Sequence, residues 1–168
     1  AEVCNPLTFE RVRLGLIATG RVPTWLPTYT ISDLEPLADL TDLNQLRLAG
    51  PGVTDISPLA DLRGLERLVL AQCQVADVSP LAAIAALREL TLSGMRVTDV
   101  SSLQVLPNLS LLAMFNNPMR DACSLAQCAH LTRLTIKDCP ISSFPEHGMA
   151  RSIEALELSG TMLEDLSI

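Results

Sequence analysis

Aspartate shows the most regular chemical pattern in this sequence, because it recurs at one position with a 22-residue period. The column consists of Asp33, Asp55, Asp77, Asp99, Asp121 and Asp165, and Ser143 takes the same position once. Single carboxylates one repeat apart supply too few oxygens for a calcium ion, which takes about six to eight oxygen ligands. We therefore predict no metal site here and expect each aspartate to accept hydrogen bonds from backbone N–H groups of its own turn.

The two histidines are poor candidates for catalysis. His130 aligns with Gly64 on an exposed turn, and His147 takes a position that Leu59 and Leu81 fill in other units. Neither histidine has a serine or cysteine nucleophile and an acid at a readable spacing, and the chain has no glycine-rich phosphate loop. We expect neither catalysis nor a cofactor.

The cysteines are best explained as packing residues. Cys73 and Cys139 share one repeat position, Cys128 takes a leucine position, and Cys123 aligns with serines in other units. A zinc site built on Cys128, His130 and Cys139 would lack a fourth ligand. Reduced thiols favour an intracellular, cytoplasmic location, with a secreted effector as the alternative.

A 22-residue repeat positions all of these side chains. Six units place leucine or isoleucine in the pattern L-x-x-L-x-L-x-x-N/C-x-L, which is typical of leucine-rich repeat solenoids. Their strand cores are Leu43–Leu48, Leu65–Leu70, Leu87–Leu92, Leu109–Met114, Leu131–Ile136 and Ile153–Leu158. We predict one α/β solenoid, in which short parallel strands line the concave side and short helical or 3₁₀ turns form the convex side.

The array is expected to cover residues 23–168 and to begin with a degenerate unit. In that first unit Leu26 stands one full repeat before Leu48. Residues 1–22 form a cap and a lead-in, because an Asn-Pro pair starts and Gly20 ends a predicted capping helix. Such a helix would cover the first strand, whose backbone groups would otherwise be unpaired.

The convex turns carry a specific sequence. Asp-Ile/Val-Ser-Pro-Leu recurs at residues 55–59 and 77–81, and a Ser-Ser variant occupies residues 99–103. Units of this length with this turn resemble the bacterial internalins and the leucine-rich regulatory subunit of type-1 protein phosphatase, over roughly residues 26–168. The resemblance implies a non-catalytic, protein-binding horseshoe whose ligand contacts come from exposed strand positions on the concave face.

The sequence departs from that family's pattern in two places. Asparagine fills its usual position after the strand only at Asn117, and the other occupants are Pro51, Cys73, Met95, Cys139 and Thr161. We therefore expect the hydrogen-bonded asparagine ladder to be largely missing, with cysteine a poor substitute. Residues 144–148 also replace the Asp-x-Ser-Pro-Leu turn.

Charge and hydropathy restrict the class of partner. The formal charge of -7 argues against binding of duplex nucleic acid, which needs a dense basic surface. The longest apolar run, Leu81–Leu87, is far shorter than the roughly 20 residues of a membrane span. We expect a protein partner, without nucleic acid or membrane. Because the last leucine layer would be open near Ile168, we also expect a further repeat, a cap or another molecule to cover it.

Outward strand positions on the concave face are the candidate binding residues, because the repeat does not dictate them. They include Trp25, Gln45, Arg47, Arg67, Val69, Glu89, Leu111, Phe115, Arg133, Lys137 and Glu157. Four of these side chains are cationic and two are anionic, which leaves a local charge of +2 within a chain of -7. Aromatic residues and arginine dominate interface hot spots.

These observations predict a non-catalytic scaffold or regulatory subunit that binds a protein through its concave face. The alternative function is substrate recognition within a larger enzyme or a secreted effector. A plain solvated surface is the alternative interpretation of the concave face itself.

Overall fold

The structure is a computed structural model of the chain, and it describes residues 32–145 and 153–163. The predicted capping helix before Gly20, Trp25, His147, Asp165 and the end at Ile168 lie outside the described residues.

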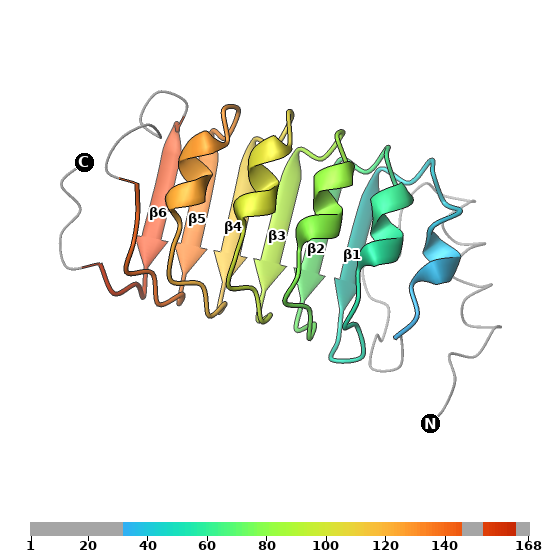
Figure 1. The fold of residues 1–168 in the computed structure, drawn as a ribbon, viewed down its shortest axis with the longest axis horizontal. Coiled ribbons are helices and arrows are strands. Elements are labelled where there is room, and N and C mark those ends of the chain that lie inside the picture. Colours follow the sequence, from blue (N-terminus) through green and yellow to red (C-terminus); the bar gives the residue numbers. More distant parts are fainter. Residues whose placement is uncertain (1–31, 146–152, 164–168) are drawn as a thin grey trace.

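Six strands of five residues each form one sheet within the described part of the chain. They are β1 (Gln45–Ala49), β2 (Arg67–Ala71), β3 (Glu89–Ser93), β4 (Leu111–Phe115), β5 (Arg133–Lys137) and β6 (Ala155–Ser159). The 3₁₀ turns are η2 (Glu35–Leu37), η3 (Ser57–Asp61), η4 (Ser79–Ala83), η5 (Ser101–Val105) and η6 (Cys123–Gln127). One such turn follows each strand from β1 to β4, and these turns line up along one side of the sheet (Figure 1).

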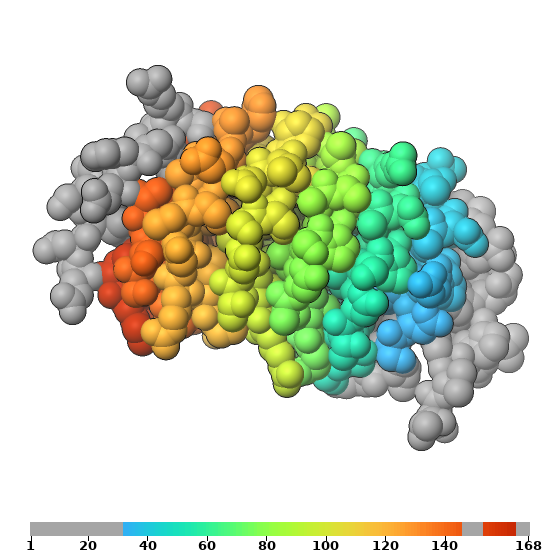
Figure 2. All heavy atoms as spheres, viewed as in Figure 1, coloured from blue at the N-terminus to red at the C-terminus, as the bar shows by residue number. Residues whose placement is uncertain are grey.

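All neighbouring strands are parallel and follow one another in chain order. Their register equals the repeat, so that Leu46 pairs with Leu68, which pairs with Leu90. The space-filling view shows the units as successive bands from the N-terminal to the C-terminal side (Figure 2). Each unit therefore packs against its neighbours in sequence, as the predicted solenoid requires.

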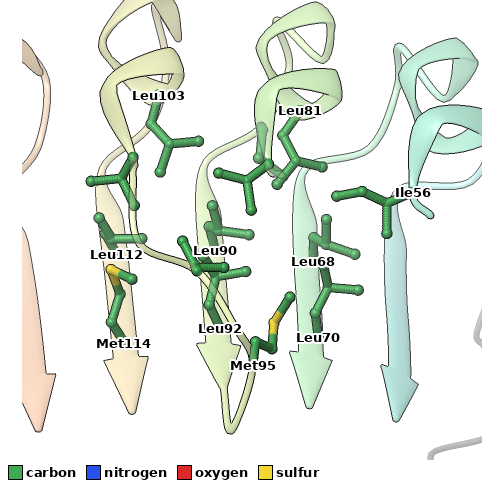
Figure 3. Packing of buried hydrophobic residues seen from close by; sticks show 14 of the residues in the cluster. Ile56, Leu68, Leu70, Leu81, Leu90, Leu92, Met95, Leu103, Leu112 and Met114 are labelled. Carbon is green, nitrogen blue, oxygen red and sulfur yellow. The ribbon is translucent and has the colours of Figure 1, made fainter. Parts of the chain in front are cut away.

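The core is a ribbon of aliphatic side chains between the sheet and the 3₁₀ turns. Along each strand the second and fourth residues point inward, since alternate side chains of a strand face opposite sides. Leu90 and Leu92 are completely buried in this way, and Leu81 and Leu103 cover them from the η4 and η5 turns (Figure 3). Sheet and turns thus bury one another in every central unit.

The aspartate column has the predicted capping role in the five described turns. Oδ1 of each aspartate accepts the backbone N–H of the residue two positions later, at 3.0 Å for Asp33 and 2.8 Å for Asp55, Asp77, Asp99 and Asp121. The Ser57 hydroxyl also donates to Asp55 and, with the Ser57 N–H, lowers the pKa of that carboxyl. Hydrogen bonds from the following backbone likewise lower the pKa of Asp77 and Asp121. The prediction of structural carboxylates is confirmed here.

A column of left-handed residues directly after the strands was not predicted from the sequence. Gln72, Asn116 and Asp138 have φ of 55°, 50° and 53°, and Gly94 and Gly160 have φ of 61° and 62°. All five stand one repeat apart, at the position where the chain turns away from the sheet. Glycine at three of the six equivalent positions, including Gly50, was the signal in the sequence.

We expect Gly94→Ala to destabilise the fold by about 1–2 kcal/mol, because a side chain in this left-handed conformation is strained. A Cβ at Gly94 would also lie 2.3 Å from Nε2 of Gln72, which must move aside. Urea unfolding followed by circular dichroism measures the loss. Gln72→Ala is the matched control and should change stability by less than about 0.5 kcal/mol, since that residue already carries a Cβ in the same conformation. Equal effects would contradict this assignment of strain.

Candidate protein-binding surface

The outward side chains of the six strands form three rows across the sheet. The strand register defines the first row as Gln45, Arg67, Glu89, Leu111, Arg133 and Ala155. The second row is Arg47, Val69, Thr91, Ala113, Thr135 and Glu157. The third row is Ala49, Ala71, Ser93, Phe115, Lys137 and Ser159. Ten of the eleven predicted binding residues thus share one face, and Trp25 lies outside the described residues.

Strand β4 carries an apolar ridge through this face. Its three outward residues, Leu111, Ala113 and Phe115, are all half-buried but keep part of their surface in contact with solvent. The same positions of β3 are acidic or hydroxylic, and those of β5 are basic or hydroxylic. The ridge therefore separates a strand with an acidic side chain from a strand with basic side chains, so the two sides of the face differ in charge.

Two of the four concave cations are neutralised within the face. Arg67 Nε lies 3.3 Å from Glu89 Oε1, and Lys137 forms an ion pair with Glu157. Arg47 and Arg133 are exposed, and neither takes part in an ion pair with any residue that the structure describes. From the sequence, all four cations are expected to be equally available to a partner. In the structure, the positive charge that is available on this face lies at Arg47 and Arg133.

Hydrogen bonds behind β4 fix the turn that follows Phe115. The Asn117 side chain is 2% exposed, and its Nδ2 donates to the carbonyl of Phe115 at 2.9 Å and to that of Leu92 at 3.0 Å. This asparagine therefore ties β4 to β3 at the end of the apolar ridge. It has the backbone-bonding role that the sequence predicted for its position.

Cysteine replaces asparagine better than the sequence predicts. The Cys139 Sγ accepts the N–H of Asn117 and donates to the carbonyl of Lys137, both at 3.4 Å. Cys73 makes the corresponding bond to the carbonyl of Ala71 at 3.4 Å. Burial raises the pKa of both thiols, which keeps them protonated and able to donate. The ladder is thus weakened at these positions but not absent.

The other candidate ligands are not brought together. His130 is exposed, whereas Cys128 and Cys139 are buried in the core, and burial raises the pKa of the Cys128 thiol. Within residues 32–145 and 153–163, no group of three or more histidine, cysteine, aspartate or glutamate side chains could hold a metal ion. The same ranges contain no helix that is long and apolar enough to cross a membrane.

Solved structures of known proteins share this arrangement. An internalin C2 from Listeria monocytogenes str. 4b F2365 is 32% identical with a TM-score of 0.73, and the match covers 82% of this chain and 61% of that chain. The chain is a leucine-rich repeat protein. An internalin (inlF) from the same strain is 25% identical with a TM-score of 0.58, and the match covers 82% of this leucine-rich repeat chain and 47% of that chain.

The leucine-rich repeat array is also similar to part of an effector structure. The leucine-rich repeat domain of the type III effector XopL is 26% identical with a TM-score of 0.60, and the match covers 73% of this chain and 46% of that chain. This leucine-rich repeat protein thus spans less than two thirds of the length of each of these three chains. No protein-family model and no curated protein matches its sequence.

The leucine-rich repeat fold does not by itself restrict the class of ligand. TLR13, solved in a complex with a single-stranded RNA, is 19% identical with a TM-score of 0.64, and the match covers 78% of this chain and 21% of that chain. That likeness concerns the fold alone. The expected exclusion of nucleic acid therefore rests on the charge of -7 and has no support from the fold.

Proposed function

We propose that this leucine-rich repeat protein is a non-catalytic module that binds another protein through its concave face. The observation that carries the proposal is the apolar ridge of Leu111, Ala113 and Phe115, which crosses the sheet at β4 and stays partly open to solvent. The exposed Arg133 lies beside its first residue. Apolar anchors next to an unpaired arginine are the groups that dominate protein interfaces.

A second candidate function is substrate recognition within a larger enzyme or an effector. The lengths of the similar chains favour this second function. The matches cover 61% or less of each of those chains, so each is longer than this array. XopL supports the same idea, since its leucine-rich repeats are one domain of a type III effector. An intracellular location, which reduced thiols favour, belongs to the scaffold proposal. A secreted location belongs to the effector proposal.

Replacement of Phe115 by alanine is expected to raise the dissociation rate of a protein partner by at least tenfold. Truncation of an aromatic anchor removes contact area that holds the bound state, whereas it hardly changes diffusional encounter. The partner is first isolated by affinity capture on the wild-type chain. Surface plasmon resonance then measures its dissociation from wild type and from the variant.

The convex double variant Asp77→Asn with Asp99→Asn is the control for this measurement. It removes two turn-capping carboxylates and lowers stability, but it leaves every concave side chain unchanged. Partner affinity should therefore equal that of wild type once the variant is folded. Loss of binding in the convex variant together with normal binding in Phe115→Ala would place the interface on the other side and refute the proposal.

A further inference from the structure

We infer that the concave face recognises an extended acidic segment of its partner, with two carboxylates six residues apart and two apolar side chains between them. This inference rests on the proposed function and specifies the chemistry of the partner. It comes from the order of unpaired cations and apolar side chains along one diagonal of the sheet, which passes through Arg47, Val69, Leu111 and Arg133.

The diagonal begins and ends with the two arginines whose charge is available. Arg47 belongs to the second row on β1, and Arg133 belongs to the first row on β5. Within the described part of the chain, no ion pair neutralises either guanidinium. Guanidinium groups bind carboxylates through paired hydrogen bonds, so each arginine is suited to one acidic side chain.

Apolar side chains occupy the next position inward from each arginine. Val69 is the register partner of Arg47 on β2, and Leu111 is the register partner of Arg133 on β4. Both are half-buried, so part of each side chain is open to a ligand. Along the diagonal the order is therefore cation, apolar, centre, apolar, cation.

The centre of the diagonal lies at β3 and carries no net charge. Glu89 is already paired with Arg67, and Thr91 is neutral. An incoming acidic segment thus meets no unpaired carboxylate between its two anchoring arginines.

The spacing of these sites matches an extended chain. Four strand intervals and a two-residue offset along the strands separate the two arginines by about 20 Å, and six residues of extended chain also span about 20 Å. Side chains on one face of the segment recur about every 6.7 Å, so they would lie about 7 and 13 Å from the first carboxylate. Val69 and Leu111 lie about 5 and 15 Å along the same line.

A polypeptide fits this pattern better than the two other occupants that the face could accept. A single-stranded RNA carries a phosphate at every nucleotide, whereas the diagonal offers only two cations with apolar groups between them. A second copy of this chain would bring together two molecules that each carry a charge of -7. The expected segment has the form acid-x-apolar-x-apolar-x-acid, which reads the same in both chain directions.

Synthetic peptides test the inference on the full chain. The probe is a fluorescein-labelled peptide with the core Glu-Thr-Leu-Thr-Leu-Thr-Glu between Gly-Ser flanks. The matched control exchanges the Glu and Leu positions, giving Leu-Thr-Glu-Thr-Glu-Thr-Leu with identical composition and charge. A third peptide has Gln in place of both Glu residues. Fluorescence anisotropy is expected to show at least tenfold tighter binding of the probe than of either control peptide, and weaker binding of the probe as salt is raised.

Protein variants locate the binding site of the probe. Arg47→Gln and Arg133→Gln should each weaken probe binding at least threefold, and the double variant should weaken it at least tenfold. Arg63→Gln is the matched control, because that exposed arginine precedes β2 outside the concave rows, and it should bind as wild type does. Circular dichroism of every variant verifies the fold.

Each outcome decides the inference. It is wrong if the probe and the rearranged control peptide bind equally, or if no peptide binds at about 1 mM, which is roughly the weak limit of specific recognition. It is also wrong if Arg133→Gln binds the probe as Arg63→Gln does, or if oligouridylate binds more tightly than the probe. Phe115 lies in the third row, off the diagonal, so its alanine variant should keep probe binding. If Phe115→Ala weakens the captured partner while the peptides do not discriminate, the proposed function stands and this inference fails.

Discussion

Replacement of Leu90 by alanine is expected to destabilise the protein by about 2–5 kcal/mol, through lost burial and the cavity that remains. Leu90 is fully buried in β3, the third of the six described strands, and its register partners are Leu68 and Leu112. The loss therefore removes contacts in its own unit and in both neighbouring units. Because the stability of a repeat array includes the interfaces between neighbouring units, the effect should reach all three of them. Urea denaturation monitored by circular dichroism gives the change in the free energy of unfolding.

Thr91→Ala is the matched control for this measurement. Thr91 adjoins Leu90 in the same strand but points to the concave face, where it is half-buried and makes no hydrogen bond with its side chain among those described. Its replacement should change stability by less than about 1 kcal/mol. Equal destabilisation by both variants would mean that inward and outward positions have been interchanged.

The fold could be predicted from the sequence because one period fixes both the elements and their neighbours. Once Leu46, Leu68 and Leu90 are recognised as equivalent, parallel pairing in register follows, and the structure has that pairing. Alternation within each strand then assigns the concave face. The 3₁₀ turns η3 and η4 follow from Ser-Pro after aspartate, since both residues favour the start of a helical turn, and the repeat predicts the equivalent turns of the other units.

The electrostatics of the concave face could be predicted only in part. Arg67 and Glu89 stand one repeat apart, so the period places them side by side and their ion pair could have been anticipated. Lys137 pairs diagonally with Glu157, which belongs to another row, and this choice depends on side-chain conformations that no period specifies. Counting charges therefore gave the correct net value but the wrong distribution of available charge.

The ladder position after the strand was misjudged for a different reason. The repeat pattern assigns the hydrogen-bonding role at this position to asparagine, but a buried thiol also has one donor and one weak acceptor. Cys139 uses both, with Lys137 and Asn117 as its partners. At Cys73 the equivalent donor is missing, because Pro51 stands where Asn117 stands in the later unit and proline has no N–H. Local chemistry of the neighbouring unit therefore decides how complete the ladder is.

Asn117→Leu is expected to destabilise the protein by about 1–3 kcal/mol, because it removes a buried side-chain donor from the carbonyl of Leu92 and from that of Phe115, which retains the N–H of Gly94. Those carbonyls accept hydrogen bonds from Nδ2 at 3.0 and 2.9 Å. The side-chain Oδ1 has no hydrogen-bond partner among the described residues, so its removal recovers a part of the loss. Chemical denaturation of the full chain measures the net change.

Asn108→Leu provides the comparison with an exposed bond of the same kind. Its Nδ2 donates to the carbonyl of Ala85 at 2.8 Å, but solvent can replace that donor, so the cost should stay below about 0.5 kcal/mol. Because Asn117 also fixes the turn after Phe115, hydrogen exchange at the amide of Asn116, which donates to Lys137, should accelerate in Asn117→Leu. If the two leucine variants are equally stable and Asn116 exchanges as in wild type, the buried ladder does not hold the end of the apolar ridge in place.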